Sequence, residues 1–438
     1  MHRLYKGLCV CCFVLSLASC SQDKKLPTGE RLSILDTYSV ELNYNSSQIA
    51  SLPRPTTNNA WTQNGLNSQH VIGNLTAGSS LKEVWTNNFG KGVNKRDILL
   101  AAPVVQNNRV FVMDAKGVVT AFSMLDGTEL WKNNLTTKNI NFKDTKSRAS
   151  GLAVDNMMLY ATTGFGGVYA MDAISGTPKW RKVLEAPIRT APTITPEMIL
   201  IQTVDNKLYA LDKMSGDELW RFGVAHEDTV IAGGASPAYD AEDNIVVAGF
   251  SNGEVVVLNA LIGTPLWSHM LVSNNQVSST TEINSITSYP IVENGTIYAI
   301  SNGNIMVALD TRTGDTLWQN EIGSTQNMLL VGEYLFVISN KNILYAVNKT
   351  DGTIAWSLDM KEYLDDVDRN GETYAAHPIM IDGNILLAFS NGKVFKINAL
   401  KGKVVAKTNL NMDISNGLIV VNKNVIAISD DAEIYTLE

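Results

Sequence analysis

The sequence predicts an all-β fold, an eight-bladed β-propeller built from four-stranded antiparallel blades. Three observations predict it: a recurring Gly-x-x-x-Trp unit, a spacing of 38 to 51 residues between its copies, and no stretch with a sustained helical period. A repeat of this length is typical of propeller blades and too long for most solenoids. The unit occurs at Gly127/Trp131, Gly176/Trp180, Gly216/Trp220, Gly263/Trp267, Gly314/Trp318 and Gly352/Trp356.

Each period predicts four short strands. Residues 190–222 contain the runs "TAPTI", "MILIQT", "KLYALD" and "DELWRF", and the breaks between them carry Gly, Asn, Asp and Pro. The first run of several periods pairs a small residue with proline, as in "SYPIV" and "AHPIM". Small side chains suit the innermost strand, because the blades crowd together around the axis.

The tryptophans predict how the blades hold together. An Asp or Asn at the start of each turn can accept hydrogen bonds from the following amides, and the glycine accepts a positive φ. We expect each tryptophan to lie on the outermost strand and to bury about 200 Å² of indole against the next blade. The residues expected to dock the blades are Trp85, Trp131, Trp180, Trp220, Trp267, Trp318 and Trp356.

An eighth copy and the chain ends predict how the ring closes. "KGKVVAKTNL" at 401–410 is a degenerate copy of the unit, with Ala406 in the place of the tryptophan. The C-terminal "AEIYTLE" matches a third strand and has no fourth strand after it. We expect residues 81–88, which include Trp85, to supply that strand, because a closed ring leaves no open sheet edge.

The first 58 residues are expected to lie outside the propeller. Residues 1–19 combine Arg3 and Lys6 with an apolar run too short to span a membrane, which indicates a lipoprotein signal peptide. The run ends in "LASC", a lipobox that predicts lipidation of Cys20; an ordinary signal peptide with a chance cysteine is the alternative. Residues 20–58 are polar and turn-rich, as in a lipid-attached flexible tether, and residues 59–438 form the propeller. All four cysteines lie within the first twenty residues.

Composition and motifs point away from catalysis. The formal charge of −8, with no run of five basic residues, disfavours nucleic acid as a partner. The histidines His70, His226, His269 and His377 have no metal-ligand spacing, and there is no GxSxG motif. "TGFGG" at 163–167 lies between two predicted strands and is interpreted as a hairpin turn. We therefore expect no catalytic residue, no bound metal and no cofactor, so the protein is not expected to be an enzyme.

The hairpin pattern "[YV]-A-[LMV]-[DN]-x3-G-x3-W" resembles the repeat of the quinoprotein (PQQ-type) propellers. One branch of these contains alcohol dehydrogenases; the other is the BamB family, lipoproteins of the outer-membrane β-barrel assembly (BAM) machinery. The lipobox, the length, "LPTGERLSIL" and "AGGASPA" resemble the BamB branch. The residue after Cys20 is Ser21, not the aspartate that retains bacterial lipoproteins in the inner membrane. In this respect the chain resembles outer-membrane lipoproteins.

The resemblance implies a function in outer-membrane protein assembly. It implies a lipid-anchored scaffold on the periplasmic face of the outer membrane of a Gram-negative bacterium, without a cofactor. The implied partners are the POTRA domain of a BamA-like protein and other BAM subunits, and the implied task is to assist β-barrel proteins in folding and insertion.

A PQQ-dependent, dehydrogenase-like quinoprotein is the alternative. Such an enzyme is expected to hold a metal ion with clustered carboxylates and often a vicinal disulfide, but Cys11 and Cys12 leave with the signal peptide. The repeated Asp and Asn residues occupy equivalent places in different blades and cannot converge on one ion. Uptake of calcium and PQQ would distinguish the two functions.

The resemblance also implies a partner-binding surface on two long connections, residues 223–234 and 272–287. "TVIAGGASP" aligns with an apolar–arginine segment of the family, which implies partner-binding roles for Thr229, Ile231 and Ala232. Val230 is a further candidate, because it and Ile231 are apolar within a long connection. The family carries an acidic pair on a nearby loop, and the corresponding loop here is "SSTTEINSITSYP", which contains Glu282 and Asn284. Ala232 replaces the expected arginine, and the second connection is shorter and lacks the acidic pair. Ordinary blade-to-blade connections are the alternative interpretation.

Overall fold

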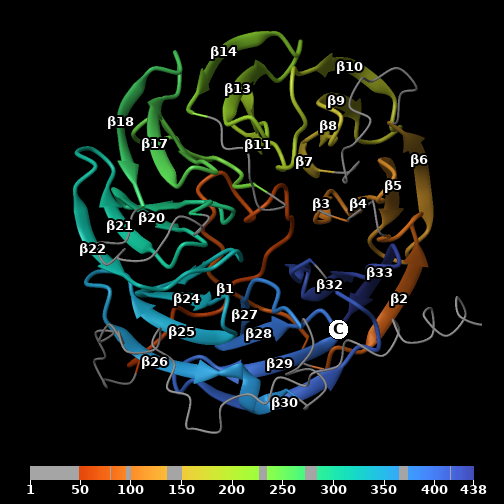
Figure 1. The fold of residues 1–438 in the computed structure, drawn as a ribbon. Coiled ribbons are helices and arrows are strands. Elements are labelled where there is room, and N and C mark those ends of the chain that lie inside the picture. The colour runs from red at the N-terminus through yellow and green to blue at the C-terminus, as the bar shows by residue number, and fades with distance from the viewer. Residues whose placement is uncertain are drawn as a thin grey trace, which may run out of the picture. The chain divides into compact units, whose positions relative to one another are not determined.

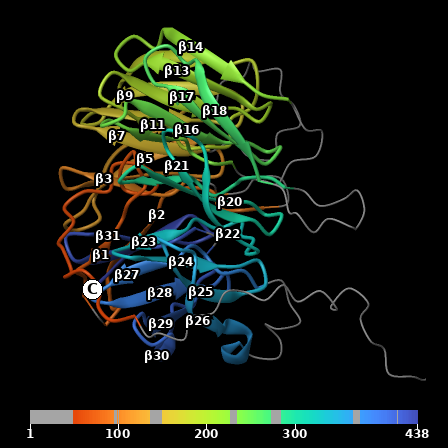
Figure 2. The same ribbon diagram turned by 90° about the vertical axis from the view of Figure 1, so that its left-hand side faces the viewer.

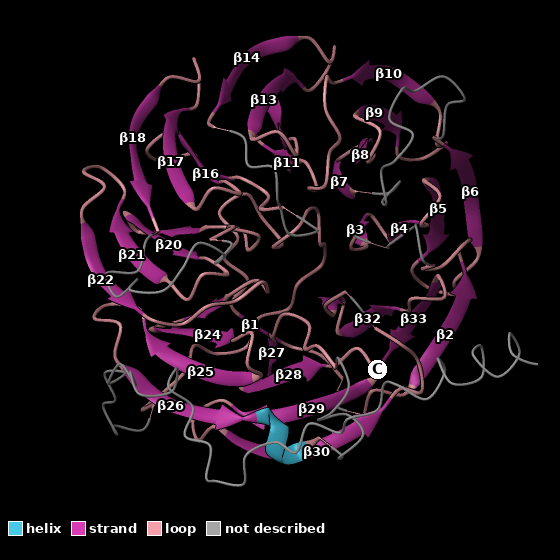
Figure 3. Ribbon diagram, viewed as in Figure 1, coloured by secondary structure: helices cyan, strands magenta, loops and turns pink. Residues whose placement is uncertain are grey.

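A computed structural model describes residues 49–78, 80–94, 99, 101–135, 150–225, 234–271, 284–364, 373–414 and 416–438. Eight sheets surround a central axis, and the predicted all-β, eight-bladed β-propeller is confirmed (Figure 1). The only helix in this part of the chain is a short 3-10 turn, η2 (Met360–Tyr363) (Figure 3). No helix in the described ranges is long and apolar enough to cross a membrane.

Strands follow one another from the axis to the outer edge of each blade. Blade 1 contains β3 (Val104–Gln106), β4 (Arg109–Met113), β5 (Val118–Ser123) and β6 (Glu129–Asn134), and blade 2 contains β7 (Gly151–Asp155), β8 (Met158–Thr162), β9 (Gly167–Asp172) and β10 (Pro178–Val183). Blade 3 contains β11 (Thr193–Ile194), β12 (Met198–Gln202), β13 (Lys207–Asp212) and β14 (Glu218–Gly223). Blade 4 contains β15 (Ala238–Asp240), β16 (Ile245–Gly249), β17 (Glu254–Asn259) and β18 (Pro265–Met270).

The remaining blades repeat this order. Blades 5 to 7 contain β19 (Ile291–Glu293), β20 (Thr296–Ile300), β21 (Met306–Asp310), β22 (Thr316–Asn320); β23 (Leu329–Val331), β24 (Tyr334–Ile338), β25 (Ile343–Asn348), β26 (Ile354–Asp359); and β27 (Ile379–Ile381), β28 (Asn384–Ala388), β29 (Lys393–Asn398), β30 (Lys403–Asn409). Blade 8 contains β31 (Ile419–Val421), β32 (Asn424–Ile428), β33 (Glu433–Leu437) and β2 (Glu83–Asn88).

Blade 8 closes the ring with strands from both ends of the chain. β2 pairs antiparallel with β33, with Asn87 opposite Ile434. This confirms the predicted closure by residues 81–88. The outer edge of β33, which would otherwise expose unpaired backbone groups, is thereby covered.

Packing between blades explains the apolar middle strands. A middle strand such as β12 is buried at all five positions, because neighbouring blades cover both faces of its sheet. The outermost strands alternate instead, as in β14, where Leu219 is 51% exposed and Trp220 is 8% exposed. A β-bulge precedes the tryptophan: Ala210 pairs with Trp220, and Leu211 pairs with Glu218.

Residues 49–76 form an N-terminal collar on the ends of the inner strands (Figures 1 and 2). The collar exchanges backbone or side-chain hydrogen bonds with seven blades, through Asn58–Val420, Trp61–Val105, Thr62–Val154, Gln63–Ile194, Ser68–Tyr239, Gln69–Val292 and the pairing of β1 (Asn74–Leu75) with β27. In blade 6, a Cβ added to Gly332 would come within 2.8 Å of Pro53 Cδ. The collar therefore contacts every blade.

The collar includes residues that the sequence places in the tether. Residues 49–58 lie on the propeller: Thr56 pairs with Leu75, and Ile49 is 3% exposed. Residues 1–48 lie outside the described part of the chain, so Cys20, the signal peptide and the first part of the tether stay predictions.

Candidate functional site

The two connections expected to bind a partner flank blade 4. Thr229, Val230, Ile231, Ala232 and Glu282 lie outside the described residues, as does His226. Asn284 is described and half-buried. The residues on either side of each undescribed stretch show where the connections begin and end.

The first connection starts at a tightly bonded turn. Asn206, buried with a φ of 57°, donates from Nδ2 to the carbonyl oxygen of Ala225 over 2.7 Å. Its Oδ1 accepts a hydrogen bond from the Ser251 hydroxyl of blade 4 over 2.8 Å. One side chain thus ties the start of the first connection to the neighbouring blade.

The far ends of both connections meet at one small cavity. This cavity has a volume of about 30 Å³, and its lining includes Gly234 and Ala235 at the end of the first connection and Ser285 and Ile286 near the end of the second. Ile286 N donates to Phe250 O of blade 4 over 3.1 Å. The structure therefore brings the described ends of the two connections to the same rim of the ring.

Asn284 fits against backbone rather than standing free. A Cβ added to Gly303 would lie 1.8 Å from Asn284 Oδ1, and a Cβ added to Gly253 would lie 2.9 Å from its carbonyl oxygen. The two glycines leave the room that Asn284 occupies between the turns of blades 4 and 5.

A second cavity lies on the axis of the ring. Its volume is about 170 Å³, and all eight blades contribute to it through residues at the start of their innermost strands or just before it. Blade 3 contributes Arg189, Thr190 and Ala191, and blade 7 contributes His377. Asn64 of the collar lines it as well and donates to Ser236 Oγ over 3.3 Å.

The axial cavity contains one cation and no acid. None of the described lining residues is Asp or Glu, and Arg189 has no ion pair or hydrogen bond of its side chain among the described residues. Burial lowers the pKa of the Arg189 guanidinium, and arginine side chains remain charged in proteins. Burial also lowers the pKa of His377 to about 4, so its imidazole is neutral at pH 7.

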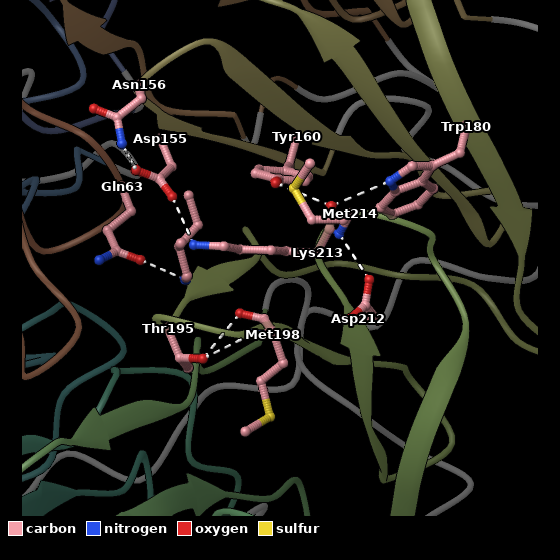
Figure 4. Close-up of polar contacts among 11 residues, drawn as sticks. Gln63, Asp155, Asn156, Tyr160, Trp180, Thr195, Met198, Asp212, Lys213 and Met214 are labelled. Atoms are coloured by element: carbon pink, nitrogen blue, oxygen red, sulfur yellow. Dashed lines mark hydrogen bonds and ion pairs between the residues drawn. The ribbon is translucent and has the colours of Figure 1, made fainter.

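The contact that recurs between neighbouring blades is visible at Trp180 (Figure 4). Its Nε1 donates to the carbonyl oxygen of Lys213, 3.2 Å away in the next blade, and the Tyr160 hydroxyl donates to the same oxygen over 3.1 Å. A Cβ on Gly216, whose φ is 78°, would lie 2.6 Å from the Trp180 ring. The indole therefore occupies space that only a glycine leaves open.

Every tryptophan of the repeat makes the same two contacts. Each ring covers the turn glycine of the next blade, and each Nε1 donates to the carbonyl three residues before that glycine. The donor–acceptor pairs are Trp85–Met124, Trp131–Ala173, Trp180–Lys213, Trp220–Ala260, Trp267–Thr311, Trp318–Lys349 and Trp356–Ala399.

Polar groups support the turn that receives Trp180 (Figure 4). The Asp212 carboxylate accepts hydrogen bonds from the amides of Ser215 and Met214, and the Ser215 amide lowers the pKa of that carboxyl. Lys213 Nζ lies 3.0 Å from Asp155 Oδ2 in blade 2. Because the pair is partly exposed, we expect it to contribute little to stability.

The eighth interface lacks an indole. Ala406 occupies the tryptophan position of its outermost strand and pairs with Lys396 on the third strand. In six of the other seven blades, the tryptophan pairs with an alanine or a valine at the equivalent position. A cavity of about 40 Å³ remains there, bordered by Leu81, Gly78 and Ala406. This gap coincides with the seam where the two ends of the chain close the ring.

The sequence did not single out the collar or Arg189. The signal for Arg189 lies in the repeat itself: "IRTAPTI" starts an innermost strand, and such starts converge on the axis in a propeller. Among the described residues, no group of three His, Cys, Asp or Glu residues is placed to hold a metal ion. A hard metal ion beside a quinone needs carboxylate ligands, so the described axial lining does not fit that pair.

Comparisons with known proteins agree with this geometry. A family model described as "Outer membrane protein assembly factor BamB" matches residues 73–149 and 115–358. The BamB of Moranella endobia is 27% identical over 307 residues, covering 70% of this chain and 76% of that protein. An uncharacterized protein of Rickettsia prowazekii is also 27% identical, over 347 residues, covering 77% and 78%.

Solved structures share the fold. BamB from Moraxella catarrhalis has a TM-score of 0.66 and 20% identity, covering 82% of this chain and 98% of that chain. A europium-containing methanol dehydrogenase has a TM-score of 0.68 and 12% identity, covering 85% and 90%. At these identities, the likeness extends to the propeller and no further.

Proposed function

This chain belongs to the outer membrane protein assembly factor BamB family. We therefore propose that it acts in outer-membrane protein assembly as a non-enzymatic scaffold, lipid-anchored through Cys20. The anchor would hold it on the periplasmic face of the outer membrane, where it would assist β-barrel proteins in folding and insertion. Family membership supports the assembly role; the lipobox supports the anchor.

The proposed partner is the POTRA domain of a BamA-like protein, alongside other BAM subunits. The proposed contact residues are Thr229, Val230, Ile231, Ala232, Glu282 and Asn284. The observation that carries this proposal is that both connections end at one rim, on either side of blade 4. Long connections on a rigid scaffold are where binding residues gather.

The chemistry of the contact follows from the residues present. Val230 and Ile231 are adjacent aliphatic residues, and the alanine at position 232 provides no charge. We therefore propose an apolar contact centred on Ile231, in which shape and burial rather than an arginine provide the affinity.

Rigidity of the scaffold is proposed to come from the tryptophan–glycine contacts. Trp85, Trp131, Trp180, Trp220, Trp267, Trp318 and Trp356 would dock each blade onto the next. Their hydrogen bonds and close packing, described above, support this role because each indole is satisfied at its one polar atom.

The test measures binding of the purified protein to the POTRA domains of the BamA-like protein from the same bacterium. Ile231→Asp, alone and with Glu282→Lys, should weaken binding about tenfold or more while the melting temperature stays within a few degrees. The matched control is Ile174→Asp, at an exposed aliphatic residue in a blade 2 turn outside both connections. Unchanged binding by the folded double variant would move the interface elsewhere.

A further inference from the structure

The two ends of the ring's axis are built differently. The residues that line the axial cavity come from the start of the innermost strand of each blade or just before it, whereas most hydrogen bonds between the collar and the blades involve later residues of that strand. In blade 2, Ser150 and Leu152 line the cavity, and Val154 N donates to Thr62 O of the collar over 2.7 Å. Figure 1 shows the collar, in red and orange, crossing the middle of the ring.

The collar lies on one side of the axial cavity, where Asn64 lines it and donates to Ser236 Oγ. A cavity of about 170 Å³ accommodates a small molecule or the end of a chain.

The polar groups of the cavity favour an anion with a single charge. Arg189 is its one cation, and the lining provides hydrogen-bond donors rather than acids. The side-chain amides of Gln326 and Asn327 have Nε2 and Nδ2 groups with no hydrogen bond to another described residue. A guanidinium with amide donors beside it matches a carboxylate, which accepts two parallel hydrogen bonds from arginine.

Apolar residues line the same cavity. Ala102, Val104, Leu152 and Ala191 come from blades 1, 2 and 3, next to Arg189 in ring order. A ligand with a hydrocarbon group close to its carboxylate can bury that group here, whereas a phosphate dianion would leave the apolar wall unused and one charge unpaired.

From this geometry we propose that the axial cavity binds a carboxylate that carries a hydrocarbon group, with Arg189 as the residue that pairs with it. Two sources share this chemistry: the C-terminal residue of a polypeptide, inserted end-on, and a free short-chain carboxylic acid. This proposal depends on Arg189 and the partner contact depends on Ile231, so different variants test them and either proposal can fail without the other.

Calorimetric titration of the full-length, detergent-solubilised protein distinguishes these sources. The probes are N-acetyl-Ala-Leu with a free carboxylate, the same peptide as its C-terminal amide, and isovalerate. We expect the peptide acid to bind and the amide to bind at least about tenfold more weakly. Peptide acid tighter than isovalerate supports a chain end, and equal affinity supports a free acid.

Variants assign the carboxylate to Arg189. Arg189→Gln should weaken binding of the peptide acid about tenfold or more, and Gln326→Leu should weaken it severalfold. Arg312→Gln, at an exposed turn of blade 5, is the matched control and should change nothing. Melting temperatures show that each variant is folded.

A measurement on the unaltered protein gives an independent test. Phenylglyoxal modifies accessible arginines, and mass spectrometry reports the modified fraction at each position. The peptide acid should protect Arg189 and leave Arg312 unprotected. Equal binding of the acid and the amide, unchanged binding by folded Arg189→Gln, or no protection of Arg189 at saturating peptide would each overturn the proposal.

Discussion

The indole Nε1 of Trp220 donates a hydrogen bond to the carbonyl oxygen of Ala260, 2.9 Å away in the next blade. Three residues after Ala260, Gly263 lies under the same ring, where an added Cβ would approach to 2.5 Å. The acceptor and the glycine belong to one turn, so the turn positions both. This relationship explains why the repeat keeps its glycine and its tryptophan together.

Removal of one indole should loosen one interface. We expect Trp220→Ala to lower the free energy of unfolding by about 3–5 kcal/mol, the usual cost of a large cavity in a core. The matched control is Leu219→Ala on the same strand, where the side chain is 51% exposed and the expected change is within about 0.5 kcal/mol. Guanidinium unfolding followed by circular dichroism measures both, and equal stabilities would refute the docking role.

The loss of stability caused by a Gly→Ala substitution in a turn should depend on which atoms lie beside the glycine. Gly216 and Gly295 have similar φ angles, 78° and 75°, but an added Cβ meets the Trp180 ring at 2.6 Å in the first case and nothing closer than 3.8 Å in the second. Gly295→Ala should cost about 1–2 kcal/mol of backbone strain. Gly216→Ala should cost at least about 1 kcal/mol more through overpacking; equal losses in the unfolding assay would mean that the ring moves aside freely.

The start of the folded body can be tested by truncation. A chain that begins at Ile49 keeps the whole collar, whereas one that begins at Asn59 loses the hydrogen bonds of Asn58 with blade 8 and of Thr56 with β1. We expect the shorter chain to be less stable by roughly 3–5 kcal/mol, at about 1 kcal/mol for each hydrogen bond lost. Identical melting temperatures would instead place residues 49–58 in the tether.

Acid should weaken the collar through His70. Burial lowers the pKa of His70 to about 4 from 6.5, so the unfolded chain binds the proton more readily than the folded one. The stabilisation is complete above pH 6.5 and is lost as the pH falls toward 4. Between pH 7.5 and 4.5 this residue should account for about 2–3 kcal/mol of the loss.

The matched variant for that effect is His70→Asn. Asparagine does not titrate and tolerates the φ of 62° found at this position. Unfolding free energies at the two pH values should differ less for the variant than for the wild type. Equal pH dependence would show that His70 binds its proton equally in both states.

Lipidation should depend on Cys20 alone. Cys20→Ala is expected to abolish incorporation of labelled palmitate and to leave an unprocessed or soluble form. Cys12→Ala, in the predicted signal peptide, is the control and should be labelled like the wild type. Wild-type protein that fractionates as a soluble periplasmic protein without lipid would contradict the anchor.

Local chemistry made the blades predictable. The turn chemistry of "LDKMSGDELW" depends on Asp212, Gly216 and Trp220, which lie within nine positions of one another. Its repetition therefore predicted the four-stranded blade, the number of blades and the closure by β2, all of which the structure confirms. The function, the partners and the partner-binding segments depended on a resemblance, and five of the six residues in those segments lie outside the described ranges.

Apart from the pairing of β2 with β33, contacts between residues far apart in the chain could not be predicted in this way. By itself, the sequence determined the propeller and its closure, because the hairpin motif and the apolar periodicity of each blade lie within one repeat of about forty residues. Only the tertiary structure decided that residues 49–58 join the collar, that Arg189 faces an axial cavity built by eight blades, and that a cavity of about 40 Å³ remains at the Ala406 seam. The physical reason is that each of these depends on which surfaces meet once the ring has closed, and a polar stretch such as "LPRPTTNN" has the same composition whether it is solvated or hydrogen-bonded to inner strands.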